Sequence, residues 1–123
     1  MFLNITSKIV DDVMVVDVSG ELSRRASSLL NPVKELLADG RSNLILDLSA
    51  LTYVDSSGLG QLISIWTSIG RRGGQLILLR PSPRVREQLQ ITKLDTVFTI
   101  LDHEAEALLR IQKSVSAHTH LAT

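Results

Sequence analysis

The chain has 123 residues, of which 44% are hydrophobic, so it can bury one core of useful size but hardly two. Thirteen basic and thirteen acidic residues cancel to a net charge of zero, which excludes a global field that draws the protein to nucleic acid or an acidic membrane. The absence of cysteine excludes disulfides, thiolate metal sites and a thiol nucleophile. We therefore expect one domain that recognises its partner through a local surface, with no nucleic acid among its partners.

The first twelve residues contain neither a basic leader nor a long apolar segment. No later window approaches the roughly 18 apolar residues that a membrane span needs. We expect a cytoplasmic protein without membrane insertion. The sequence leaves its oligomeric state open between a monomer and a weak dimer.

Five segments have the pattern of strands. Four of them are short apolar runs typical of strands that are covered on both faces, at residues 13–18, 44–48, 76–79 and 97–101. A weaker alternation over residues 2–6, followed by Asp11 and Asp12, predicts an edge strand that turns back in a hairpin. The strands are expected to form one central sheet.

Four helices are predicted between and after these strands, because apolar residues recur there at spacings of three and four. Their apolar positions lie within residues 29–37, 59–69, 85–89 and 105–111. Pro32 either begins the first helix, with Ser28 or Asn31 as its cap, or kinks a longer one. Trp66, seven residues after Leu59, is expected to face the sheet, and the alternative is a half-exposed interface aromatic.

Strands that alternate with helices indicate an α/β domain. We expect a central mixed sheet, made of an edge hairpin followed by mostly parallel strands and faced by about four helices. The domain is predicted over residues 1–113. Residues 114–123 are polar and show no period, so they are expected to form a frayed tail.

The stretch LTYVDSSGLGQL gathers polar and small residues at one strand-to-helix turn. Asp55, Ser56 and Ser57 fall at the helix start, where a carboxylate or hydroxyl can accept hydrogen bonds from unpaired N–H groups. Capping explains one such residue but not three. It also does not explain Gly58 and Gly60, since glycine in a helix lowers the stability by about 1 kcal/mol relative to alanine. Small residues let another molecule approach closely, and a helix N-terminus favours a phosphate. The turn therefore predicts a docking surface that can carry a phosphoryl group.

Enzymatic functions are disfavoured. A serine nucleophile needs a nearby base, yet the histidines are His103, His118 and His120, two of them in the predicted tail, and the Gly-x-Ser-x-Gly elbow is absent. The glycines match neither a P-loop nor a dinucleotide fingerprint. We therefore expect no catalytic residue, no cofactor and no metal.

A phosphoaspartate receiver is the more serious alternative, because the chain has four aspartates that can be imagined around a magnesium ion, Asp11, Asp12, Asp47 and Asp55. However, Asp11 and Asp12 precede their strand, which directs them away from the carboxyl ends of the parallel strands. A hairpin turn is the better interpretation of this pair.

Residues 44–101, with VSGEL upstream, resemble the STAS domain of bacterial anti-sigma factor antagonists, and the likeness covers nearly the whole chain. Its most specific element is DSSGLG, placed after a strand that ends in Asp-Leu-Ser and before a Gly-Gly strand. The resemblance implies a sheet faced by four helices. It also implies a partner switch, in which the unphosphorylated protein binds an anti-sigma factor serine kinase and so frees a sigma factor.

In such a switch the kinase phosphorylates the first serine after the aspartate, here Ser56, and a PP2C-type phosphatase reverses the modification. The resemblance also implies a partner-binding surface, made of Ser23, Asp55, Ser56, Ser57, Gly58 and Leu59. The sequence departs from the family pattern at Ser23, where members commonly carry Asp, and at Ala26, where a hydroxyl is common. Ser23 removes a negative charge and the neighbouring Arg24 and Arg25 add positive ones, so the partner differs from the usual kinase, or else Ser23 is only a helix cap.

Two functions therefore remain open. The first is a phosphorylation-controlled regulator without enzymatic activity. The second is a structural STAS subunit of a lipid-transport or other multiprotein assembly, in which Ser56 only caps a helix. The hydroxyl of Ser57 and the glycines at 58 and 60 favour the first.

Overall fold

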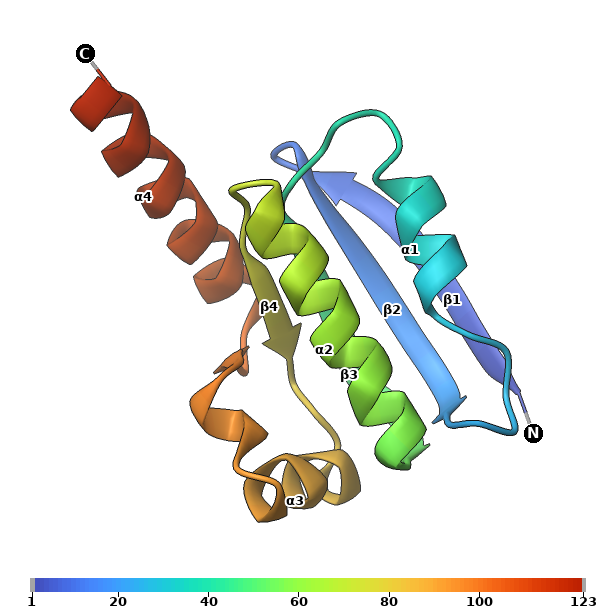
Figure 1. The fold of residues 1–123 in the computed structure, drawn as a ribbon. Helices are drawn as coiled ribbons and strands as arrows, with labels where there is room; N and C mark the ends of the chain where they lie inside the picture. The colour runs from blue at the N-terminus through green and yellow to red at the C-terminus, as the bar shows by residue number, and fades with distance from the viewer. Residues whose placement is uncertain (1, 123) are drawn as a thin grey trace.

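A computed structural model describes the backbone of residues 2–122 and the side chains of residues 2–113. Within that range the strands form one five-stranded sheet in the order β1-β2-β3-β4-β5 (Figure 1). Its first pair is antiparallel, and the other pairs are parallel. The strands are β1 (Leu3–Val10), β2 (Val13–Leu22), β3 (Leu44–Val54), β4 (Leu76–Leu79) and β5 (Thr99–Leu101). The predicted α/β domain with a mixed sheet is confirmed.

The first two strands form the predicted hairpin, although β1 extends further than residues 2–6. Asp11 and Asp12 both have positive φ angles, 51° and 65°, and Val10 pairs with Val13 across the turn. Two left-handed residues in a two-residue loop match the twist of the flanking strands, and aspartate tolerates this conformation better than most residues. The pair is therefore a hairpin turn.

The helices cover both faces of the sheet (Figure 1). Residues of α1, α2 and α3 pack in one large cluster with one side of the strands, and residues of α4 pack in a smaller cluster with the other side. Both faces are therefore buried at the centre, which explains why the parallel strands read as continuous apolar runs. The helices are α1 (Leu30–Leu36), α2 (Ser56–Arg71), α3 (Pro83–Ile91) and α4 (Glu104–Ala122), with a short 3-10 turn at Leu94–Thr96.

Helix α1 is shorter than the apolar period indicated, and its N-cap is Leu29 rather than Ser28 or Asn31. Pro32 is the third residue of this helix, so it lies near the start of the helix, as one interpretation expected, and does not kink a longer one. The Ser28 Oγ accepts a hydrogen bond from the Leu30 N–H at 3.1 Å, and the amide oxygen of Gln61 on α2 accepts one from the Leu29 N–H at 2.8 Å. The entry into α1 is thereby fixed to α2.

Helix α4 continues past Lys113 to Ala122, so the backbone is helical where the sequence showed no period. The cooperative nature of helix extension explains this, because each added residue requires only one further hydrogen bond and no new nucleus. Fraying of residues 114–123 in solution stays a prediction.

The expectation that Trp66 faces the sheet is wrong. Its side chain is 43% exposed, whereas Leu62, Ile65 and Ile69 are almost fully buried. Leu59 marks the edge of the buried stripe of α2, not its centre, so the residue seven positions later also falls at the edge. Trp66 is therefore the half-exposed aromatic of the alternative interpretation.

Leu62→Ala and Trp66→Ala are expected to differ in their effects on stability. Leu62 is fully buried, so its truncation should lower the free energy of unfolding by about 2–5 kcal/mol through lost burial and a residual cavity. Trp66→Ala should have a smaller effect, because the partly exposed indole leaves no closed cavity. Urea denaturation followed by circular dichroism measures the free energy of unfolding of both variants. A larger loss of stability in Trp66→Ala than in Leu62→Ala would contradict the half-exposed position of Trp66.

Candidate functional site

The candidate site lies where two neighbouring parallel strands end. Glu21 pairs with Tyr53 and Leu22 with Val54, so β2 and β3 finish side by side. The chain leaves β2 into the loop of residues 23–29 and leaves β3 directly into α2. This carboxyl edge is where ligand and partner sites of α/β sheets usually form.

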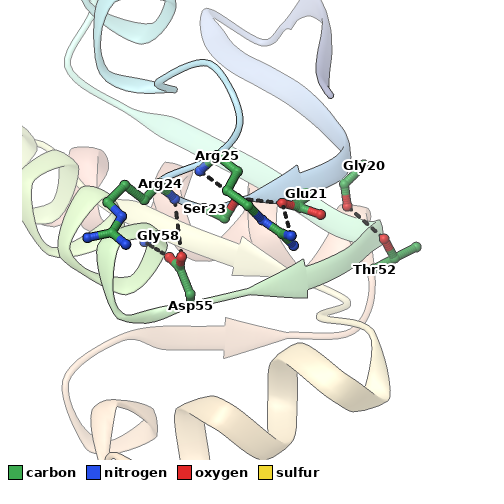
Figure 2. Close-up of polar contacts among 8 residues, drawn as sticks. All are labelled: Gly20, Glu21, Ser23, Arg24, Arg25, Thr52, Asp55 and Gly58. Atoms are coloured by element: carbon green, nitrogen blue, oxygen red, sulfur yellow. Dashed lines mark hydrogen bonds and ion pairs between the residues drawn. The ribbon is translucent and has the colours of Figure 1, made fainter. Parts of the chain in front are cut away.

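Asp55 is the N-cap of α2 and also holds the loop that follows β2. Its Oδ1 accepts a hydrogen bond from the Gly58 N–H at 2.9 Å, and its Oδ2 accepts one from the Arg24 N–H at 3.1 Å (Figure 2). Its own N–H donates to the Leu22 carbonyl oxygen at 3.3 Å. The Gly58 N–H, opposed in part by burial and assisted by the Arg24 N–H, lowers the pKa of Asp55 below its ordinary value. The carboxylate is thus fully engaged in joining the two segments.

Ser23 organises the turn after β2 from a buried position, with 1% of its surface exposed. Its Oγ donates to a Glu21 carboxylate oxygen at 2.6 Å and accepts from the Arg25 N–H at 3.2 Å, and Arg25 pairs with Glu21 in turn (Figure 2). It caps this turn and not a helix, because α1 begins only at Leu30. A partner that approaches here meets the exposed side chains of Arg24 and Arg25 first.

Gly58 is required by packing inside the molecule, contrary to the reading that assigned it to a partner's approach. A Cβ at this position would lie 2.0 Å from the Leu22 carbonyl oxygen and 2.7 Å from a Val54 methyl group. Gly60, one residue beyond Leu59, is exposed, and a Cβ there would meet nothing within 4 Å. Of the two glycines, only Gly60 leaves space for another molecule.

The two hydroxyls of the turn differ in access. Ser56, the first residue of α2, is exposed, and Ser57 is half-buried. Leu59 is 7% exposed and belongs to the core beneath the turn. The sequence-predicted residues Asp55 to Leu59 therefore form one compact turn, which presents the Ser56 side chain to solvent.

Exposed basic side chains lie on the segments that adjoin the turn. Arg24 is exposed beside the capped turn, and Arg84 lies over the Tyr53 ring with its guanidinium carbon 5.2 Å from the ring centre. The one acid of the turn, Asp55, is occupied by backbone N–H groups. The N-terminus of α2 adds a partial positive charge.

The four aspartates of the receiver alternative do not meet. Asp11 and Asp12 lie in the turn before β2, whereas Asp55 follows the end of β3. Asp47 accepts hydrogen bonds from the Ser49 N–H and from Arg80; burial raises its pKa, but these bonds outweigh that effect and lower it. Among the residues with described side chains, no three histidine, cysteine or acidic side chains are grouped as for a metal ion. In the same part of the chain, no helix is long and apolar enough to cross a bilayer.

Sequence reasoning missed two polar contacts that shape the region. Gln61 accepts from the Leu29 N–H, and Asp47, within β3, pairs with Arg80, the residue that follows β4. The signal for Asp47 was an acid inside the apolar run LILDL, where a buried charge needs a partner. The signal for Gln61 was absent, because glutamine is an ordinary helix residue.

The model of the STAS domain family matches residues 4–107. The chain belongs to the STAS domain family. A relative from Thermotoga neapolitana, provisionally named an anti-sigma factor antagonist, is 35% identical to this STAS domain over 85% of the chain and 95% of that protein. The anti-sigma F factor antagonist of Paenibacillus polymyxa is 28% identical, over 81% and 87% of the two chains.

A solved structure agrees with the sequence relatives. An anti-sigma factor antagonist from Mycobacterium paratuberculosis superposes with a TM-score of 0.78 at 28% identity, over 89% of this chain and 94% of that one. The family assignment places this STAS domain among regulatory proteins rather than enzymes.

The two glycines of the turn provide a matched test of packing. Alanine is the better helix former by about 1 kcal/mol at both positions. Gly60→Ala should therefore stabilise the protein, since nothing lies within 4 Å of the added methyl group. Gly58→Ala should destabilise it, because the methyl group meets backbone of β2. Thermal unfolding shows whether each variant has a higher or lower unfolding temperature than wild type. A higher value for Gly58→Ala would show that the space beside Leu22 admits a methyl group.

Asp55→Ala should lower the free energy of unfolding near neutral pH by about 1–2 kcal/mol, because an N-cap is lost. The pKa of Asp55 is lowered in the folded state, so its stabilising effect is complete above the unfolded value of about 3.9 and disappears as the pH falls through the folded value. The difference between wild type and variant should therefore narrow below about pH 4. Urea titrations of both proteins between neutral and acid pH measure this difference. A difference in the free energy of unfolding that stays constant to the lowest pH would refute capping by the charged carboxylate.

Proposed function

We propose that this STAS domain is an anti-sigma factor antagonist controlled by phosphorylation of Ser56. Unphosphorylated, it binds an anti-sigma factor serine kinase in the cytoplasm and so frees a sigma factor. The observation that carries the proposal is the exposed Ser56 hydroxyl at the first position of α2, on a turn whose other groups are engaged in the fold.

The chemistry required of the turn is that of an acceptor. The Ser56 Oγ attacks the γ-phosphorus of the kinase's ATP, the bond to the β-phosphate oxygen breaks, ADP leaves, and the hydroxyl proton passes to a base on the kinase. The turn contributes position: Asp55 fixes the backbone on one side of Ser56, and the buried Gly58 fixes it on the other. A PP2C-type phosphatase then hydrolyses the phosphoserine with water and restores the hydroxyl.

Phosphorylation acts on the interface more than on the fold. It adds about −1.5 to −2 charges at an exposed position. The N-terminus of α2 and the nearby guanidinium of Arg24 can stabilise this charge within the molecule. In a complex the same phosphate lies within a surface that must lose its water, and an uncompensated charge there weakens binding by several kcal/mol.

The basic residues near Ser56 identify the kind of kinase surface that fits. Arg24 and Arg25 are exposed next to position 23, where many relatives are expected to have an acid and this chain has the buried Ser23. Arg84 is exposed over the Tyr53 ring. An acidic patch on the kinase would complement them before transfer. After transfer the phosphate repels that patch and attracts Arg24, so both effects favour release.

Substitutions at Ser56 should separate binding from release. Ser56→Ala should bind the kinase and never be released by ATP, because it has no acceptor oxygen. Ser56→Glu should fold normally and bind at least a hundredfold more weakly, a loss of about 2.7 kcal/mol. Ser7→Ala, which removes an exposed serine hydroxyl from the edge strand β1, is the control and should behave as wild type. Isothermal titration with each purified anti-sigma factor kinase of the same genome measures the affinities.

The modified residue is identified by mass spectrometry after incubation with kinase and ATP. Phosphate on Ser57 would refute the residue assignment. Equal kinase binding by all variants without any label would instead support a structural STAS subunit, in which Ser56 only begins a helix.

A further inference from the structure

Helix α2 has a second face that the core does not use. Ser56, Ile63, Trp66 and Gly70 are all exposed and follow one another at spacings of seven, three and four residues. These spacings place them on one side of a helix with 3.6 residues per turn. We call these four residues the outer flank of α2. It borders the buried stripe, which contains Leu62 and has Leu59 at its edge.

The outer flank carries large apolar groups in solvent. Ile63 is 39% exposed and Trp66 is 43% exposed, and they lie one turn apart on the same helix. Single exposed apolar residues are common on protein surfaces, but adjacent ones with an aromatic are typical of interaction sites. Tryptophan is among the residues that most often dominate binding energy.

A groove runs beside the outer flank. It has a volume of about 440 Å³, and its lining includes Trp66, Gly70, Leu76 and Thr99, from α2 and the amino ends of β4 and β5. Among the helices that the structure describes, α3 lies at the carboxyl end of the strands and α4 on the opposite face of the sheet, so neither covers this groove (Figure 1). A Cβ on Gly70 would meet nothing within 4 Å, so the helix is open there to another chain.

The outer flank is continuous with the proposed phosphorylation site. Ser56 is its first member, and Trp66 lies about 15 Å further along the helix at 1.5 Å per residue. A stable protein interface covers roughly 800 Å² on each partner, which is a disc of about 16 Å radius. A kinase that places its ATP at Ser56 therefore spans far enough to cover Trp66.

We propose that the kinase that phosphorylates Ser56 docks along the outer flank of α2, with Trp66 as its apolar anchor. This inference rests on the proposed function, since it takes the occupant of the flank from the modification of Ser56. The kinase meets the flank with an apolar surface that enters the groove beside Gly70, and with acidic groups at the Arg24 end. The outer flank provides affinity, and the turn at Ser56 provides the switch.

Trp66 is the only tryptophan of the chain and therefore reports on its own contact. The full-length protein is labelled with 5-fluorotryptophan and titrated with the unlabelled, purified kinase that phosphorylates Ser56. The single fluorine resonance should shift or broaden with the same midpoint as binding. Trp66→Ala and Ile63→Ala should each weaken kinase binding, Trp66→Ala by at least tenfold, while both keep the wild-type circular dichroism.

Two control variants remove exposed apolar side chains elsewhere. Leu109→Ala lies on α4, and its side chain is 55% exposed. Leu30→Ala lies beside the groove between α1 and α2, and its side chain is 37% exposed. Both should bind the kinase as wild type does. A loss at Leu30→Ala with none at Trp66→Ala would move the dock to the other side of α2 and overturn the inference.

The remaining outcomes separate the two proposals. If the kinase binds and labels Ser56 while the fluorine resonance stays unchanged and Trp66→Ala binds normally, the docking is refuted and the switch stands. If no kinase of the genome labels Ser56, the proposed function fails and the docking fails with it. A resonance that shifts as the protein alone is concentrated would assign the outer flank to a second copy of the chain and refute the kinase as its occupant.

Discussion

The geometry of the turn depends on the bridge that Asp55 makes between two segments that leave neighbouring strands. Its two carboxylate oxygens accept from Gly58 at the start of α2 and from Arg24 in the loop after β2. Charge-assisted hydrogen bonds of this kind are stronger than neutral ones, and the lowered pKa of Asp55 reflects them. Because this acid is occupied, Ser56 is displayed on a fixed backbone beside exposed arginines and not beside a free carboxylate.

The turn therefore joins two requirements that usually conflict. A modification site must be accessible, yet an acceptor for in-line transfer must be held still. Here the rigidity comes from the packing beneath the turn, through the contact of Gly58 with Leu22 and the burial of Leu59, while Ser56 is the most exposed residue from Asp55 to Leu59. The proposed phosphorylation would therefore change the charge of the surface without entering the core, so the proposed switch is largely independent of the fold.

The sequence was informative wherever the pattern is local. The apolar runs predicted the strands, Asp11 and Asp12 predicted the hairpin, and the DSSG stretch predicted the helix start. The wrong predictions concern features set by tertiary structure. The contact of Gly58 with Leu22 depends on which strands are neighbours, and the exposure of Trp66 depends on the width of the buried stripe of α2. Periodicity gives the direction of a helical face, but its breadth is set by the sheet on which the helix rests.

The measurement that tests the central claim most directly is the affinity of one kinase for two forms of the same protein, unphosphorylated and phosphorylated on Ser56, with the unfolding temperature of each form recorded alongside. The account predicts an affinity lower by a factor of about one hundred or more for the phosphorylated form, equivalent to about 2.7 kcal/mol, at a closely similar unfolding temperature. Equal affinities, or a loss of binding accompanied by unfolding of the phosphorylated form, would contradict it.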